Sequence, residues 1–111
     1  MDPGKLSQRV KILRASTQRS DIGEIIQEWH VIAEVWAQAY EVKARELIAS
    51  VAKHIEITTR FRLRAIEVDY ADRIAWQNTY YQPVQIIPIG RREGLEILAK
   101  RLHQKTGVIK T

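Results

Sequence analysis

The stretch HIEITTRFRLRA (residues 54–65) alternates between two kinds of side chain more regularly than any other part of the chain. Its odd-numbered positions, which include Ile55, Phe61 and Leu63, are mostly apolar, and its even-numbered positions are polar or charged. Successive side chains of a β-strand point to opposite faces of the sheet. The alternation therefore predicts a strand with one buried face and one wet face.

Working outward from this stretch, five further segments have the composition or alternation of strands, namely 6–14, 29–40, 72–76, 79–87 and 95–102. Gln77-Asn78 is expected to form the turn of a hairpin between 72–76 and 79–87, whereas Pro83 and Pro88 indicate an edge or bulged strand. Six short strands favour a small antiparallel β-barrel, because closure removes exposed sheet edges.

Three segments do not fit a strand. Residues 42–52 place apolar side chains at helical spacing and predict one short α-helix. Residues 15–28, around Asp21-Ile22-Gly23, are expected to form a long mobile loop that becomes ordered against a neighbouring protein. Residues 103–111 are expected to be a flexible tail. The fold prediction is thus a mostly β single domain over residues 1–111.

The composition agrees with a β domain. The 111 residues include 15 Ile and 8 Val but only 7 Leu, and β-branched side chains suit a pleated sheet. There is no Cys, which excludes disulfides and thiolate metal sites. No apolar run is long enough to span a bilayer or to act as a signal peptide, so we expect a protein that is soluble and intracellular at synthesis.

Candidate interface residues come from two places. Ile22, Ile25 and Ile26 lie in the predicted loop, where apolar side chains would be costly to leave in water. Trp36 points away from the small-residue face of its strand. It is therefore either covered by a loop or available to a neighbouring molecule.

The arginine row Arg60, Arg62 and Arg64 lies on the polar face of the 54–65 strand. Side chains two apart on a strand stand about 7 Å from each other, so the row could bind phosphates or acidic side chains of another subunit. The alternative is a sheet face exposed to solvent, on which carboxylates such as Glu56 or Glu67 offset the positive charge of the arginines.

Nothing in the sequence supports catalysis, a metal site or a cofactor. The three histidines, His30, His54 and His103, have no partner at ligand spacing. Asp69 and Asp72 lack the glycine and further carboxylates of a calcium loop, and they suit turn acceptors better. No phosphate-binding loop, nucleophile elbow or catalytic carboxylate pair can be identified.

In their order and spacing, several short motifs resemble the head–tail joining (head-completion, stopper or adaptor) proteins of long-tailed bacteriophages and prophages. The resemblance covers roughly residues 4–102. The motifs are Gly4-Lys5-Leu6, Arg9–Leu13, Asp21-Ile22-Gly23, Trp29, Val35-Trp36-Ala37, Glu46, Ile57–Arg62, Asp72-Arg73-Ile74, Tyr80-Tyr81 and Gly94–Ile97. The chain departs from the family at Ala65–Val68 and at Gln77-Asn78, where family members often have Gly or Pro.

The resemblance implies a structural protein of the virion neck that is made in the host cytoplasm. It implies docking as a ring beneath portal and adaptor proteins, closure of the DNA-filled head, and attachment of the tail. It also suggests that Lys43, Arg45 and Lys53 of the helical segment could face the DNA channel; the alternative is an ordinary amphipathic helix that plugs one end of the barrel. The rival interpretation is a small nucleic-acid-binding barrel that uses the arginine row, for which the sequence pI of about 9.7 argues.

Overall fold

The computed structural model describes residues 6–42, 57–102 and 108–110. The described chain is built of strands, and no helix occurs in these ranges. The strands are β1 (Gln8–Arg19), β2 (Ile25–Glu41), β3 (Thr59–Arg64), β4 (Arg73–Trp76), β5 (Thr79–Ile89), β6 (Gly94–Leu102) and β7 (Val108–Lys110).

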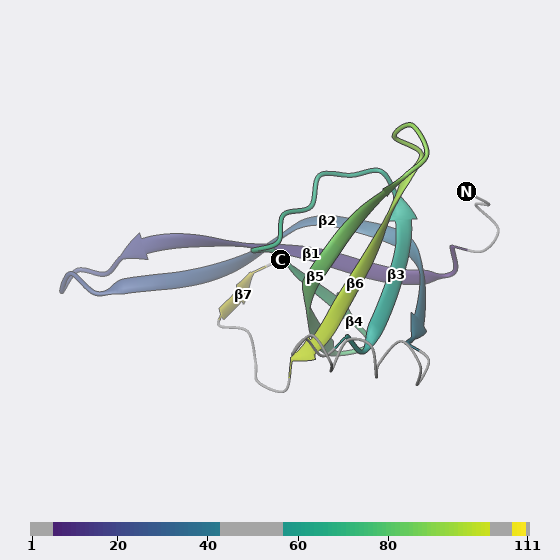
Figure 1. Ribbon diagram of the computed structural model, residues 1–111. Helices are drawn as coiled ribbons and strands as arrows, with labels where there is room; N and C mark the ends of the chain where they lie inside the picture. Colours follow the sequence, from purple (N-terminus) through teal and green to yellow (C-terminus); the bar gives the residue numbers. More distant parts are fainter. Residues whose placement is uncertain (1–5, 43–56, 103–107, 111) are drawn as a thin grey trace.

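Six of these strands close into an antiparallel barrel (Figure 1). Their order is β1-β4-β5-β6-β3-β2, and a further pairing of β2 with β1 closes the circle. The predicted mostly β barrel is therefore confirmed. The predicted helix at 42–52 is not, because residues 43–56 lie outside the described ranges and Val42 itself is not helical.

The central strand has the predicted register. In β3, Thr59, Phe61 and Leu63 are buried, whereas Arg62 and Arg64 are exposed. The strand is shorter than predicted, since Ile57 and Thr58 precede it in an irregular conformation. The backbone N–H of Thr58 still donates to the carbonyl of Ala99, and the carbonyl of Thr58 accepts the N–H of Val42. The hydrogen bonding between neighbouring strands therefore continues to Thr58.

The core lies inside the barrel and is centred on Phe61, which is fully buried. Its ring meets those of Trp76 and Tyr81 edge-on, at centroid distances of 5.7 and 5.3 Å. Such edge-to-face pairs add to the stabilisation that comes from burial itself. The other buried core residues are Val10, Ile12, Ala37, Leu63, Ile74, Ile97 and Ala99.

The long loop predicted at 15–28 is wrong. β1 continues to Arg19 and β2 begins at Ile25, so that only residues 20–24 form a turn. β1 and β2 pair with each other as far as Arg19 and Ile25. β4 pairs with β1 only over Lys11–Leu13, so the paired strands continue well beyond the barrel wall. Figure 1 shows the result as a two-stranded ribbon that projects from the barrel. We call residues 14–30 the arm and residues 20–25 its tip.

The hairpin predicted at Gln77-Asn78 is confirmed. Both residues have positive φ values, 50° and 60°, which a two-residue turn of type I′ requires. The register of β5 against β6 shifts between Pro83 and Gln85, as expected for a strand that contains a proline.

The flexible tail predicted for residues 103–111 is wrong for Val108–Lys110. These residues form β7, which pairs in parallel with Glu28–His30 at the base of the arm. Residues 103–107 and 111 lie outside the described ranges. No helix among the described residues is long and apolar enough to cross a membrane.

Candidate functional site

The tip of the arm presents apolar side chains to water. Ile22 and Ile25 are 80% and 69% exposed, and Ile26 beside them is also exposed. The structure thus places the three isoleucines, which the sequence marked as interface candidates, together at one end of the molecule. Burial of an isoleucine side chain is worth roughly 1.5–3 kcal/mol, so the cluster favours contact with another surface.

The turn itself is built by local hydrogen bonds. Ser20 donates its N–H to the carbonyl of Glu24 at 2.8 Å, and its own carbonyl accepts the N–H of Gly23 at 2.9 Å. The Ser20 hydroxyl accepts the N–H of Glu24 at 3.1 Å. Gly23 has a φ of 85°, a conformation that other residues rarely adopt. The tip is therefore an ordered turn that holds Asp21 and Ile22 outward.

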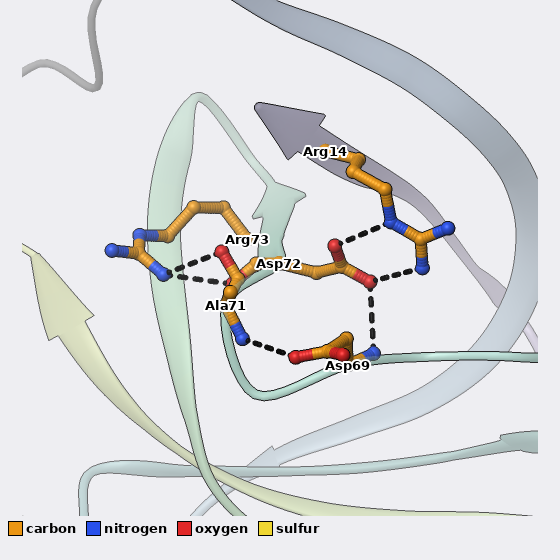
Figure 2. A network of polar contacts seen from close by, with 5 residues as sticks. All are labelled: Arg14, Asp69, Ala71, Asp72 and Arg73. Carbon is orange, nitrogen blue, oxygen red and sulfur yellow. Dashed lines mark hydrogen bonds and ion pairs between the residues drawn. The ribbon is translucent and has the colours of Figure 1, made fainter. Parts of the chain in front are cut away.

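The base of the arm is fixed to the barrel by a buried carboxylate (Figure 2). Asp72, whose side chain is 1% exposed, accepts two bonds from the guanidinium of Arg14, at 2.9 and 2.8 Å. It also accepts the N–H of Asp69 at 2.9 Å. The hydrogen bonds that Arg14 donates to the Asp72 carboxylate, and next the charge of that carboxylate, raise the pKa of Arg14 above its ordinary value. A bidentate pair of this kind fixes direction as well as distance.

A second arginine completes the joint from the other side. Arg73 donates to the carbonyls of Asp72 and Ala71, at 2.9 and 3.2 Å. Its guanidinium stacks over the ring of the buried Trp29, 5.0 Å from the centroid. Burial lowers the pKa of Arg73, and the charge of Asp72 opposes that shift.

These joint residues were missed as a site by sequence analysis, which treated Asp69 and Asp72 as turn acceptors. That role is confirmed for Asp69, which accepts the N–H of Ala71 at 2.9 Å. No local pattern could reveal the main partner of Asp72, because Arg14 lies 58 residues away in the sequence.

Trp36 lies on the outer wall of the barrel and is 53% exposed. Arg9, its partner across the β1–β2 ladder, stacks on the indole at 5.0 Å and pairs with Glu34 at 3.0 Å. Ile32 is exposed two positions before Glu34 on the same strand. Trp36 is thus available to a neighbouring molecule, not covered by a loop.

The arginine row is partly neutralised. Glu96 on the adjacent β6 lies 3.1 Å from Nε of Arg60 and 3.5 Å from Nε of Arg62. Arg60 also lies over the ring of Tyr40, 5.5 Å from its centroid. Only Arg64, at the end of β3, is exposed without a carboxylate this close among the described residues.

The two carboxylates expected to offset the row do not account for this neutralisation. Glu56 lies outside the described ranges. Glu67 makes no ion pair with the row in the part of the chain that the structure describes. Its charge instead helps to raise the pKa of Arg14, at the base of the arm. Glu96, which the sequence analysis did not single out, takes the role that was expected of them.

A groove of about 460 Å³ lies on the outside of the barrel beside the arm. Its floor includes Lys11, Ala75 and Tyr80, which face outward in register across β1, β4 and β5. Among the described residues that line it, Arg9 and Lys11 are charged and none is a carboxylate. The remaining lining residues are Leu13, Val31, Trp76, Gln77 and Asn78.

One constellation on the arm superficially suggests catalysis. Nε2 of His30 lies 2.8 Å from the hydroxyl of Ser16 and 3.8 Å from a carboxylate oxygen of Glu28. A catalytic relay needs the acid on the opposite ring nitrogen, where it orients the imidazole. Here both partners share Nε2, so the arrangement is not a relay. Within the described ranges, no group of acidic and histidine side chains could hold a metal ion.

The proposed channel residues Lys43, Arg45 and Lys53 lie outside the described ranges, so that their role stays a prediction. The described structure thus offers three separate features: an exposed apolar arm tip, a fixed base of the arm, and a basic apolar groove on the barrel wall. Such surfaces suit docking of protein to protein, since apolar exposure is combined with few, specific charges.

Comparisons with known proteins identify the fold and the family of the chain. The fold is similar to the solution structure of a protein from Shigella flexneri 2a, with a TM-score of 0.78 and 26% sequence identity. That match covers 95% of this chain and 100% of the other. A comparison with curated protein sequences finds no match. The family model of phage head completion proteins matches residues 1–102, which is nearly the whole sequence. The chain therefore belongs to the phage head completion protein family.

Proposed function

We propose that this protein docks as a ring under the portal and adaptor proteins, closes the DNA-filled head and provides the platform for the tail. Membership of the head completion family gives it a structural role in the phage particle, in contact with other head and tail proteins. The proposal adds the neck as its position and a ring as its assembled form.

The observation that carries the proposal is the arm. A two-stranded ribbon that ends in exposed isoleucines has no function within its own barrel, since it projects away from the core. The Arg14–Asp72 pair holds the base of that ribbon in a defined direction. A rigid projection with an apolar end is what docking into a larger assembly requires, because pre-organisation lowers the entropy cost of binding.

The DNA channel is the second part of the proposal. Lys43, Arg45 and Lys53 would face the DNA, and a ring would repeat their weak attraction to phosphate in every subunit. The charge-reversal set Lys43→Glu, Arg45→Glu and Lys53→Glu is expected to fold and to enter particles. The resulting heads are expected to leak DNA or fail to gain tails. Normal DNA retention and tail joining would leave these residues without a channel role.

The geometry supports a nucleic-acid-binding barrel less well. Glu96 pairs with two of the three arginines that such a surface would use. An electrostatic groove for single strands also relies on aromatic side chains for base stacking, and no aromatic residue of β3 lies on the face that carries these arginines, since Phe61 points into the core. A salt-dependent mobility shift of the isolated protein with DNA would favour this alternative over the neck role.

Co-sedimentation with purified portal–adaptor complexes tests the proposed function. The protein is expected to co-sediment with these complexes. A variant with Ile22→Ser, Ile25→Ser and Ile26→Ser should fold but bind more weakly. The matched control, Arg91→Ser with Arg92→Ser on the exposed β5–β6 turn, should bind like the wild-type protein. Absence of binding by the wild-type protein would contradict the proposal.

A further inference from the structure

We propose that the arm tip of one copy docks into the basic apolar groove of the next copy, and that this contact links the subunits of the ring. The inference rests on the proposed function, because it concerns the contact within the assembled ring. It pairs two surfaces of this chain that the fold leaves exposed.

The two surfaces are complementary in charge. The tip carries the carboxylates of Asp21 and Glu24 next to exposed isoleucines. The charged residues that line the groove in the described part of the chain are Arg9 and Lys11, and none of its described lining residues is a carboxylate. Arg9 already pairs with Glu34, whereas Lys11 makes no ion pair among the described residues. Lys11 is thus the cation best placed to receive a carboxylate from the tip.

The surfaces are also complementary in polarity. Ile22 and Ile25 need apolar surroundings, and the groove lining includes Val31, Ala75 and Tyr80. Its volume of about 460 Å³ falls within the roughly 300–1,000 Å³ that is typical of sites that enclose a ligand of several apolar groups.

The groove cannot be filled by the tip of its own chain. Leu13 lines the groove, and the tip begins seven residues further along the chain, directly after Arg19 at the end of the same extended strand. At about 3.3 Å per residue, the tip therefore lies roughly 20 Å away along a straight ribbon. A tip that occupies the groove must therefore come from another molecule.

A second copy is the occupant that the geometry favours. Tip and groove are different surfaces of one chain, so a tip-in-groove contact is heterologous and leaves a tip and a groove free for the next subunit. Repetition of such a contact closes into a ring when the rotation between subunits permits. The contact thus supplies the assembly that the proposed function needs.

Disulfide cross-linking tests the contact, because the natural chain has no cysteine. Ile22→Cys places a thiol on the tip, and Ala75→Cys places one on the groove floor. Phage particles that carry this double variant would be oxidised, denatured and separated without reductant. We expect a ladder of covalent multimers of this protein. The control pair, Ile22→Cys with Arg91→Cys, should give no ladder, since Arg91 is on the β5–β6 turn and does not line the groove.

Neutralisation of the charges provides a second measurement. Lys11→Gln in the cysteine pair should lower the cross-linked fraction, and so should Asp21→Asn with Glu24→Gln. The two changes combined should lower it little further, because the partners act as a pair. Thermal melts of the purified variants would confirm that each one folds.

The outcomes separate this inference from the proposed function. Assembled, tailed particles that contain the protein but give no ladder would overturn the tip-in-groove contact and leave the neck role standing. So would cross-linking of Ile22→Cys to a different protein of the particle. Particles that gain tails without containing the protein at all would overturn both.

Discussion

At the scale of single residues, the fold depends on which side of β3 faces the core. Phe61 is fully buried among Trp76 and Tyr81, whereas Arg62 beside it is exposed. Phe61→Ala should lower the free energy of unfolding by about 3–5 kcal/mol, because it leaves a cavity in the core. Arg62→Ala should change it by less than about 1 kcal/mol. Chemical denaturation of both variants measures this ranking, and the reverse order would mean that the strand register is shifted by one residue.

The buried Asp72 is the second residue on which the structure depends. Asp72→Ala leaves the Arg14 guanidinium and the N–H of Asp69 without their acceptor. The free energy of unfolding should fall by at least about 1 kcal/mol, which corresponds to a decrease of roughly 4–8 °C in the melting temperature. Asp21→Ala, at the exposed tip, serves as the matched control and should melt like the wild-type protein. Equal melting temperatures for the two variants would contradict the role given to the Asp72 network.

The turn residues of the β4–β5 hairpin offer a stabilising change. Gln77 and Asn78 both occupy positive φ, where asparagine and glycine are preferred. The double change Gln77→Asn with Asn78→Gly should therefore raise the free energy of unfolding by roughly 0.5–1 kcal/mol. A decrease in the melting temperature would show that the contacts of the Gln77 and Asn78 side chains stabilise the fold by more than the relief of backbone strain does.

At the scale of elements, sequence patterns were informative wherever one face of a strand is buried. The register of β3 was predicted correctly, because its alternation between apolar and polar side chains reports the inside and outside of the barrel, although the strand is shorter than predicted. β6 was predicted to within one residue, as 95–102. The β4–β5 hairpin could be predicted because its turn occupies two residues between β-rich segments.

The same patterns failed for the arm and for β7. From Thr17 to Arg19 and from Ile25 to Gln27, every residue of the arm is exposed, so no alternation marks the strands. These residues are ordered by pairing with each other, not by burial, and their composition is that of a loop. β7 has three residues and pairs with Glu28–His30, which are distant in sequence. The groove was likewise unpredictable, since its lining residues come from separate strands.

Amide hydrogen exchange can distinguish an ordered arm from a mobile loop. Along Arg14–Arg19, alternate amides point toward β2 and toward an edge that carries no partner strand among the described residues. Protection is therefore expected to alternate with a period of two residues in the free protein. Uniformly fast exchange over these residues would contradict a paired ribbon.

At the scale of the whole molecule, the fold divides into a stable body and a projecting ribbon (Figure 1). The closed barrel removes the free edges that would aggregate, while the arm keeps an apolar tip and, among the described residues, backbone edges that no further strand covers. The Arg14–Asp72 joint ties the direction of the arm to the barrel. A small head completion protein can thus combine a rigid wall with a reaching contact in one short chain.

The central claim, that this chain completes phage heads so that tails can join, is tested most directly by reconstitution. DNA-filled heads made without the protein would be mixed with purified tails, and infectious particles would be counted with and without added protein. Wild-type protein should restore tail joining, and the triple Ile→Ser arm variant should restore far less while it melts normally. Equal tail joining in the absence of the protein would contradict the account.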